Sequence, residues 1–130
     1  MTGMRFVSIL LLALASAPSL HAAQPAPAGH VIIMGQLTLK PGREADFRTL
    51  IAEMGARTRR EDHGNLRYDF YTATPMQGGA TTWVFVEEWQ DQASALAHQK
   101  WAGPLVTSEW RALSDSMEFK RLELVNLPAP

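Results

Sequence analysis

The chain has 130 residues, of which 46% are hydrophobic and 19% charged, a composition typical of one globular domain and not of a disordered or fibrous chain. It carries 12 basic and 13 acidic residues, for a formal net charge of −1, so nucleic acid and anionic membrane surfaces are not expected partners. It contains no cysteine, which excludes thiol catalysis, cysteine metal ligands and disulfides.

Residues 1–22 have the layout of a secretory signal peptide. Arg5 precedes the apolar run Phe6–Ala15, and the segment ends at Ala22 in mostly small residues. The run is too short to span a bilayer comfortably, so we expect cleavage near Ala22 in preference to an N-terminal membrane anchor. Residues 23–29, AQPAPAG, have the composition of a linker. The predicted mature protein is periplasmic or secreted, without a membrane partner after cleavage, and its domain covers residues 30–127.

The first half of this domain shows two hydrophobic periodicities. Residues 30–40 are apolar at both parities, which predicts a strand covered on both faces. Residues 43–60 predict a helix, because their apolar side chains recur at helical spacing along one face. Residues 65–72 predict a strand, because apolar and polar side chains largely alternate along them, and Gly78-Gly79 predict the hairpin connection that follows.

The second half begins with the return strand of the hairpin, expected over residues 81–90. Asp91 is a favourable N-cap for a helix that Gly103-Pro104 interrupts, with a further helix opening at Pro104. Residues 117–127 predict a last strand. The order β-α-β-β-α-β predicts a ferredoxin-like α+β fold, a four-stranded antiparallel sheet with helices on one face. Because several strands are apolar on both faces, we expect a second copy to cover the open face in a homodimer.

Three short motifs stand in a characteristic order: LKPG at residues 39–42, REDHGNLRY at 60–68, and EWQDQA at 88–93 followed by Ala97-His98. Together they resemble the antibiotic biosynthesis monooxygenase family, which includes quinol monooxygenases. The resemblance extends from about Val31 to Val125 and implies a dimeric α+β barrel with a pocket inside each subunit, between sheet and helices. The superfamily also includes isomerases and haem-degrading enzymes, so the fold alone does not assign a reaction.

His98 and Tyr68 are the expected catalytic residues. A histidine titrates near neutral pH, so His98 could take a phenolic proton and raise the electron density that reaction with dioxygen requires. Tyr68 could donate a hydrogen bond to the developing oxyanion. The structural alternatives are a histidine hydrogen-bonded to a strand and a core tyrosine whose hydroxyl reaches a carbonyl.

Trp83, Trp101 and Glu88 are the expected substrate-binding residues. The two indoles could stack on a planar substrate and exclude water, with core filling as the alternative for each. Glu88 could orient His98, and the alternative is a solvated edge or a rim ion pair.

No cofactor is expected. His30, His63 and His98 lie in separate elements, which gives poor support for a metal site, and haem bound by His98 is not indicated. The function we predict is a cofactor-independent monooxygenase that acts on a small aromatic quinol or phenol and dioxygen. The alternatives are a non-catalytic binding module for a small hydrophobic molecule, or an isomerase or lyase for a reactive carbonyl compound.

Overall fold

The computed structural model describes residues 29–125. The predicted signal peptide, nearly all of the predicted linker and the last residues of the predicted domain lie outside this range. The elements, in chain order, are β1 (Val31–Leu39), α1 (Glu44–Glu61), β2 (Asn65–Ala73), β3 (Thr82–Trp89), α2 (Gln92–Leu105), the π-helical turn η1 (Val106–Trp110), α3 (Arg111–Leu113) and β4 (Ser114–Leu122). Within residues 29–125, no helix is long and apolar enough to cross a membrane.

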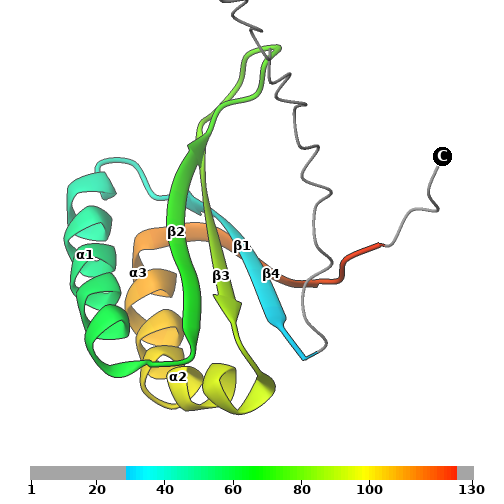
Figure 1. Cartoon of the computed structure of the whole chain (residues 1–130). Coiled ribbons are helices and arrows are strands. Elements are labelled where there is room, and N and C mark those ends of the chain that lie inside the picture. The colour runs from blue at the N-terminus through cyan, green and yellow to red at the C-terminus, as the bar shows by residue number, and fades with distance from the viewer. Residues whose placement is uncertain (1–28, 126–130) are drawn as a thin grey trace, which may run out of the picture.

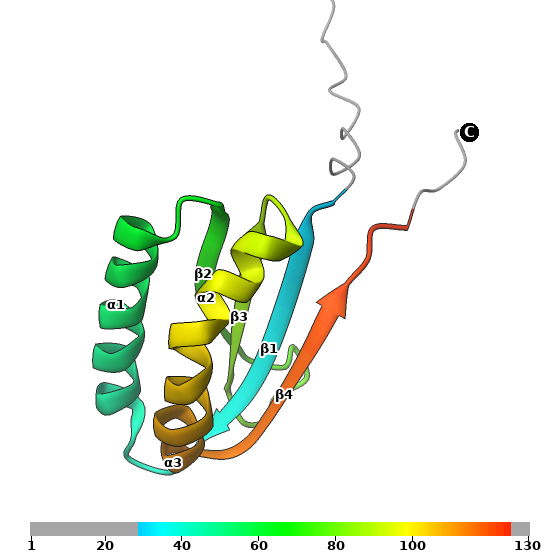
Figure 2. The ribbon, with the colours of Figure 1, turned by 90° about the horizontal axis from the view of Figure 1, so that it is seen from below.

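The four strands form one antiparallel sheet in the order β2-β3-β1-β4. The helices all pack on one face of this sheet, and the other face is left open (Figures 1 and 2). Figure 2 shows α1 beside the β2 edge and the α2–α3 segment over the middle of the sheet, with β4 at the opposite edge. The predicted ferredoxin-like α+β fold is therefore confirmed.

Strand β3 decides which residues face the helices. Its buried positions are Trp83, Phe85, Glu87 and Trp89, and the positions between them are only partly buried. The buried set points toward the helices, whereas Val84, Val86 and Glu88 point to the open face. Because paired residues on neighbouring strands share a face, the register extends this assignment to Tyr68 and Phe70 on β2 and to Ile33 and Gly35 on β1.

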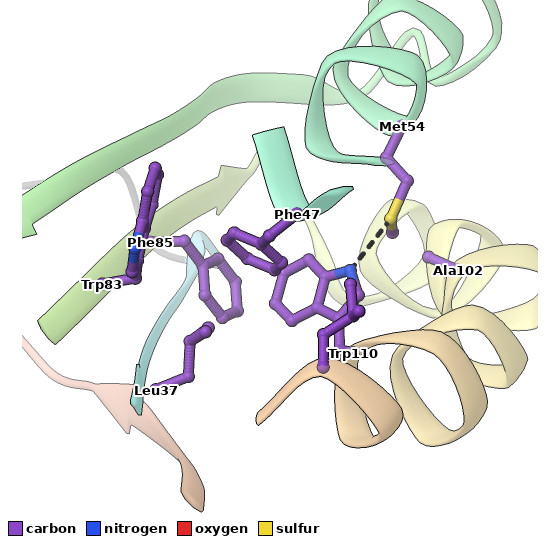
Figure 3. Close-up of a cluster of buried hydrophobic side chains, with 8 residues drawn as sticks. Leu37, Phe47, Met54, Trp83, Phe85, Ala102 and Trp110 are labelled. Carbon is purple, nitrogen blue, oxygen red and sulfur yellow. Dashed lines mark hydrogen bonds between the residues drawn. The ribbon is translucent and has the colours of Figure 1, made fainter. Parts of the chain in front are cut away.

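The core lies between the helices and the sheet, and it is rich in aromatic side chains (Figure 3). Phe47 of α1 is fully buried and meets Trp83 and Trp110 edge to face, with ring centroids 5.2 Å and 5.4 Å apart. The indole N–H of Trp110 donates to Sδ of Met54 over 3.2 Å. Trp110 thus links the second helical segment, which consists of α2, η1 and α3, to α1. It also lines a cavity between this segment and the sheet.

The prediction that Gly103-Pro104 interrupts the second helix is wrong. Helix α2 continues through Pro104 to Leu105, and η1 and α3 extend the helical segment to Leu113. Proline lacks the N–H that would bond one turn back, and here the helical turns widen into a π turn directly after it. The hydroxyl of Ser108 donates to the carbonyl oxygen of Pro104 over 2.9 Å, which binds these two turns together.

Helix α2 begins where the sequence predicts, and strand β4 begins earlier than predicted. The predicted N-cap is confirmed, since the Asp91 side chain accepts a hydrogen bond from the Ser94 backbone N–H over 2.7 Å. The last strand begins at Ser114, not at Met117 as predicted, and ends at Leu122. Its early start follows from pairing, because Ser114 lies opposite Leu39 across a register shift in β1.

Candidate active site

A cavity of about 330 Å³ lies between the second helical segment and the sheet. Its polar lining residues are Tyr68, Glu87, His98, Gln99 and Thr107, and its larger apolar ones are Ile33, Phe85, Val106, Trp110 and Phe119. The cavity is partly open, and Phe119 on the edge strand β4 is 43% exposed. A mostly apolar space with a few convergent polar groups is what a small-molecule site requires.

The structure brings the two predicted catalytic residues together on this cavity. Tyr68 reaches it from β2 and His98 from α2, and their ring centroids are 5.4 Å apart with the planes at 68°. Glu87 of β3 is paired with Tyr68 in the sheet and lines the same cavity. Three titratable groups from three elements thus share one wall, and the chemical roles of Tyr68 and His98 remain predictions.

His98 is 3% exposed and is held on several sides. Its Nδ1 lies 2.9 Å from Oδ2 of Asp62, and its Nε2 lies 3.5 Å from Oε2 of Glu87. The rings of Trp89 and Trp101 pack against it, with centroid distances of 4.6 Å and 4.8 Å. The imidazole is therefore fixed in orientation by two carboxylates and two indoles.

Asp62 directly follows the last turn of α1 and reaches across to α2. One carboxylate oxygen contacts His98, and the other accepts a hydrogen bond from the Trp101 indole N–H over 3.3 Å. Because a carboxylate only accepts hydrogen bonds, Nδ1 of His98 carries the proton in this contact. Asp62 thereby selects the tautomer whose Nε2 holds the lone pair.

Burial is the largest influence on the pKa values of His98, Glu87 and Tyr68. It lowers the pKa of His98, although the hydrogen bond and charge of Asp62 act in the opposite direction. It raises the pKa of Glu87 to about 7, opposed by the Trp89 indole N–H and reinforced by the charge of Asp62. Burial first, and then the charge of Glu87, also raises the pKa of Tyr68, so the phenol stays protonated and able to donate.

The predicted pocket walls lie outside the cavity. Trp83 is near the hairpin end of β3, where it packs in the core beside Phe47 and under the guanidinium of Arg48. Trp101 lies behind His98, with the Arg57 guanidinium 4.2 Å from its ring centroid, because its position on α2 directs it toward α1. Trp110 and Phe85 form the aromatic walls instead.

The prediction that Glu88 orients His98 is also wrong. Glu88 points to the open face of the sheet, where its Oε1 lies 2.9 Å from Nδ1 of His30. The preceding residue, Glu87, faces the cavity and contacts His98. The one-residue difference reverses the face, since side chains alternate along a strand.

Sequence reasoning missed two functional candidates, Glu87 and Asp62. For Glu87 a signal existed, because it shares its parity with Trp83, Phe85 and Trp89 and is the one charged residue in that row. For Asp62 the sequence holds no signal beyond its place in the REDHG motif, because its contact with His98 spans 36 residues.

No group of three or more His, Cys, Asp or Glu side chains within residues 29–125 is arranged to hold a metal ion.

Comparison with known proteins gives the family. No curated protein matches the sequence. Among solved structures, PA3566 from Pseudomonas aeruginosa is 18% identical, with a TM-score of 0.61 over 76% of this chain and 97% of the other. SnoaB from Streptomyces nogalater, described as a cofactor-independent oxygenase, is 20% identical, with a TM-score of 0.60 over 78% and 100% of the two chains. Rv0793 from Mycobacterium tuberculosis is also 20% identical, with a TM-score of 0.57 over 78% and 100%.

The fold shared with this chain covers almost the full length of each of these three structures. The sequence profile of the antibiotic biosynthesis monooxygenase family matches residues 30–102, more than half of the chain, and this stretch contains Asp62, Tyr68, Glu87 and His98. The chain belongs to the antibiotic biosynthesis monooxygenase family.

Proposed function

We propose that the protein is a cofactor-independent oxygenase that oxidises a small aromatic quinol or phenol with dioxygen. The observation that carries this proposal is the meeting of Tyr68 and the Asp62-bound His98 on the wall of one mostly apolar cavity. Membership of the family and the description of SnoaB as a cofactor-independent oxygenase support it.

In the proposed reaction His98 is the general base and Tyr68 is the oxyanion partner. Removal of the phenolic proton gives an electron-rich anion that can itself reduce dioxygen, so the protein has to deprotonate, orient and desolvate the substrate. The raised pKa of Tyr68 suits its part, because a phenol that stays protonated can donate to the substrate anion. The cavity of about 330 Å³ is at the small end of ligand sites, which fits a substrate of one or two rings.

We further propose that the protein works as an exported homodimer. The open face of the sheet carries the partly buried Ile32, Met34, Val84 and Val86 at its centre, and Tyr71 is 43% exposed beside them. An apolar face of this kind favours cover by a second copy. Light scattering at micromolar concentration should give a dimer, and sequencing the N-terminus of periplasmic protein should give a chain that begins near Ala23.

Oxygen uptake with a panel of substituted hydroquinones tests the activity. We expect substrate-dependent uptake, and a loss of about 100-fold or more in His98→Ala, since a general base contributes at least that much. Glu88→Gln is the control. It removes a carboxylate from β3 on the face of the sheet away from His98 and the cavity, so it should retain the wild-type rate. An unchanged rate in His98→Ala would refute the assigned role. Quenching of tryptophan fluorescence by these phenols, without oxygen uptake, would favour a binding module.

A further inference from the structure

Glu87 is a buried carboxylate on the wall of the cavity. Its side chain is 8% exposed, at the centre of the sheet, with Tyr68 opposite it on β2 and Ile33 opposite it on β1. Within residues 29–125 no lysine or arginine lies within ion-pair distance of it, and His98 is its only possible partner of that kind. Burying an ionisable group without a permanent countercharge is costly, so a purely structural role does not explain its place.

Both ring nitrogens of His98 are directed at carboxylates. Nδ1 lies 2.9 Å from Asp62 and Nε2 lies 3.5 Å from Glu87, so the second nitrogen already has a carboxylate as its neighbour at the cavity wall. A lone pair on Nε2 and an ionised carboxylate are both acceptors and would repel each other. The contact therefore favours one proton held between Glu87 and His98, and Glu87 itself lines the cavity in which a substrate would bind.

We propose that Glu87 is a further catalytic residue, which receives the substrate's phenolic proton and passes a proton on to Nε2 of His98. The inference rests on the proposed function and names the path of its first step. The substrate O–H bond breaks and an O–H bond forms at the cavity-side oxygen of Glu87, while the O–H bond at its Oε2 breaks and an N–H bond forms at Nε2. No electrons leave the substrate in this step, which yields a substrate anion and an imidazolium beside Asp62.

Asp62, Glu87 and Tyr68 each carry a group that this proton path requires. Asp62 holds the proton on Nδ1 and offers a negative charge next to the imidazolium that forms. Glu87 has two oxygens, so one can accept while the other donates. Tyr68 stands beside Glu87 on the same wall, where its hydroxyl can stabilise the substrate anion after the proton has left.

A coloured phenol tests the path without oxygen. Para-nitrophenol absorbs differently as phenol and as phenolate, and it would be mixed with excess protein about one pH unit below its own ionisation midpoint. We expect the wild type to hold the bound probe as phenolate. Glu87→Gln keeps the size of the side chain and a donor toward Nε2, but an amide does not relay a proton, so its bound probe should remain neutral. His98→Gln should give the same result, and Glu88→Gln should behave as the wild type.

The outcomes separate this inference from the proposed function. Phenolate bound equally by Glu87→Gln and the wild type would overturn the inference, as would a wild type that binds the probe only in its neutral form or not at all. Ionisation that requires Glu87, in a protein without oxygen uptake on any hydroquinone, would leave the proton path standing and refute the oxygenase. Where uptake occurs, Glu87→Gln should lower kcat about 100-fold with little change in KM. The double variant with His98→Gln should lose no more than either single variant.

Discussion

Replacing Glu87 by glutamine should stabilise the fold at alkaline pH and leave its stability unchanged in acid. The pKa of this carboxyl group rises from an ordinary 4.5 to about 7 on folding, chiefly because burial disfavours its charged form. Below the lower value both the folded and the unfolded chain carry the proton, so folding has no cost from this group. As the pH rises the unfolded chain releases its proton first, and stability falls until the folded chain has released it too.

The size of the effect follows from the same two values. Each tenfold difference in proton affinity corresponds to about 1.4 kcal/mol, so the move from 4.5 to about 7 gives at most about 3–4 kcal/mol. Glutamine fills nearly the same volume and carries no charge. Glu87→Gln should therefore match the wild type near pH 4 and exceed its free energy of unfolding by about 2–3 kcal/mol near pH 8.

Urea unfolding followed by tryptophan fluorescence, at one fixed protein concentration, measures this difference across the pH range. Asp62 and His98 are the titratable groups next to Glu87, Arg57 acts on His98, and Arg121 follows Ile33 in the same row of the sheet. The lowered pKa of His98 makes the wild type less stable as the pH falls through the ordinary value of 6.5. Near pH 8 the imidazole is neutral in the folded and the unfolded chain, so the difference there reports on Glu87. A difference that stays constant with pH, or a variant less stable at pH 8, would refute the reasoning.

Two further substitutions test the scaffold around the site. Asp91→Ala removes the side chain that caps Ser94 at the start of α2, and it should lower the free energy of unfolding by about 1 kcal/mol in the same urea assay. Gly35→Ala places a methyl group where the Phe85 ring lies, so it should cost about 1–3 kcal/mol and weaken ligand binding, because Phe85 lines the cavity. Unchanged stability would contradict the role of the Asp91 cap in the first variant, and the close approach of Phe85 to Gly35 in the second.

Hydrophobic periodicity was sufficient to predict the order of the main elements. It failed where tertiary contacts overrode a local preference. Proline disfavours a helix interior, yet Ala102 and Trp110 on either side of Pro104 are buried in the core and keep the segment helical. The polar start of β4 at Ser114 has no strand periodicity, and only its pairing with Leu39 makes it a strand.

The site was predictable in part for a related reason. His98 and Tyr68 followed from residue chemistry, the family resemblance and the parity of their elements. The choice between Glu87 and Glu88 did not, because β3 is apolar on both faces and only the helices that cover one face distinguish them. The bulge in β2 adds a second ambiguity. Strict alternation would place Leu66 on the face of Tyr68, but the register shifts between Asn65 and Arg67, and Leu66 is 52% exposed.

The alternation of Glu87 and Glu88 also bears on how catalysis and dimerisation could coexist. Glu87 serves the cavity on the helical side, while Glu88 pairs with His30 on the open face. A second copy packed on that open face would cover the Glu88–His30 pair and would not touch His98. The partly open cavity has Gln99 of α2 and the exposed Phe119 of β4 in its wall, near the sheet edge that no helix covers in Figure 2. A dimer formed through the open face would leave this edge uncovered, so the proposed dimer and the proposed proton path use opposite faces of the sheet.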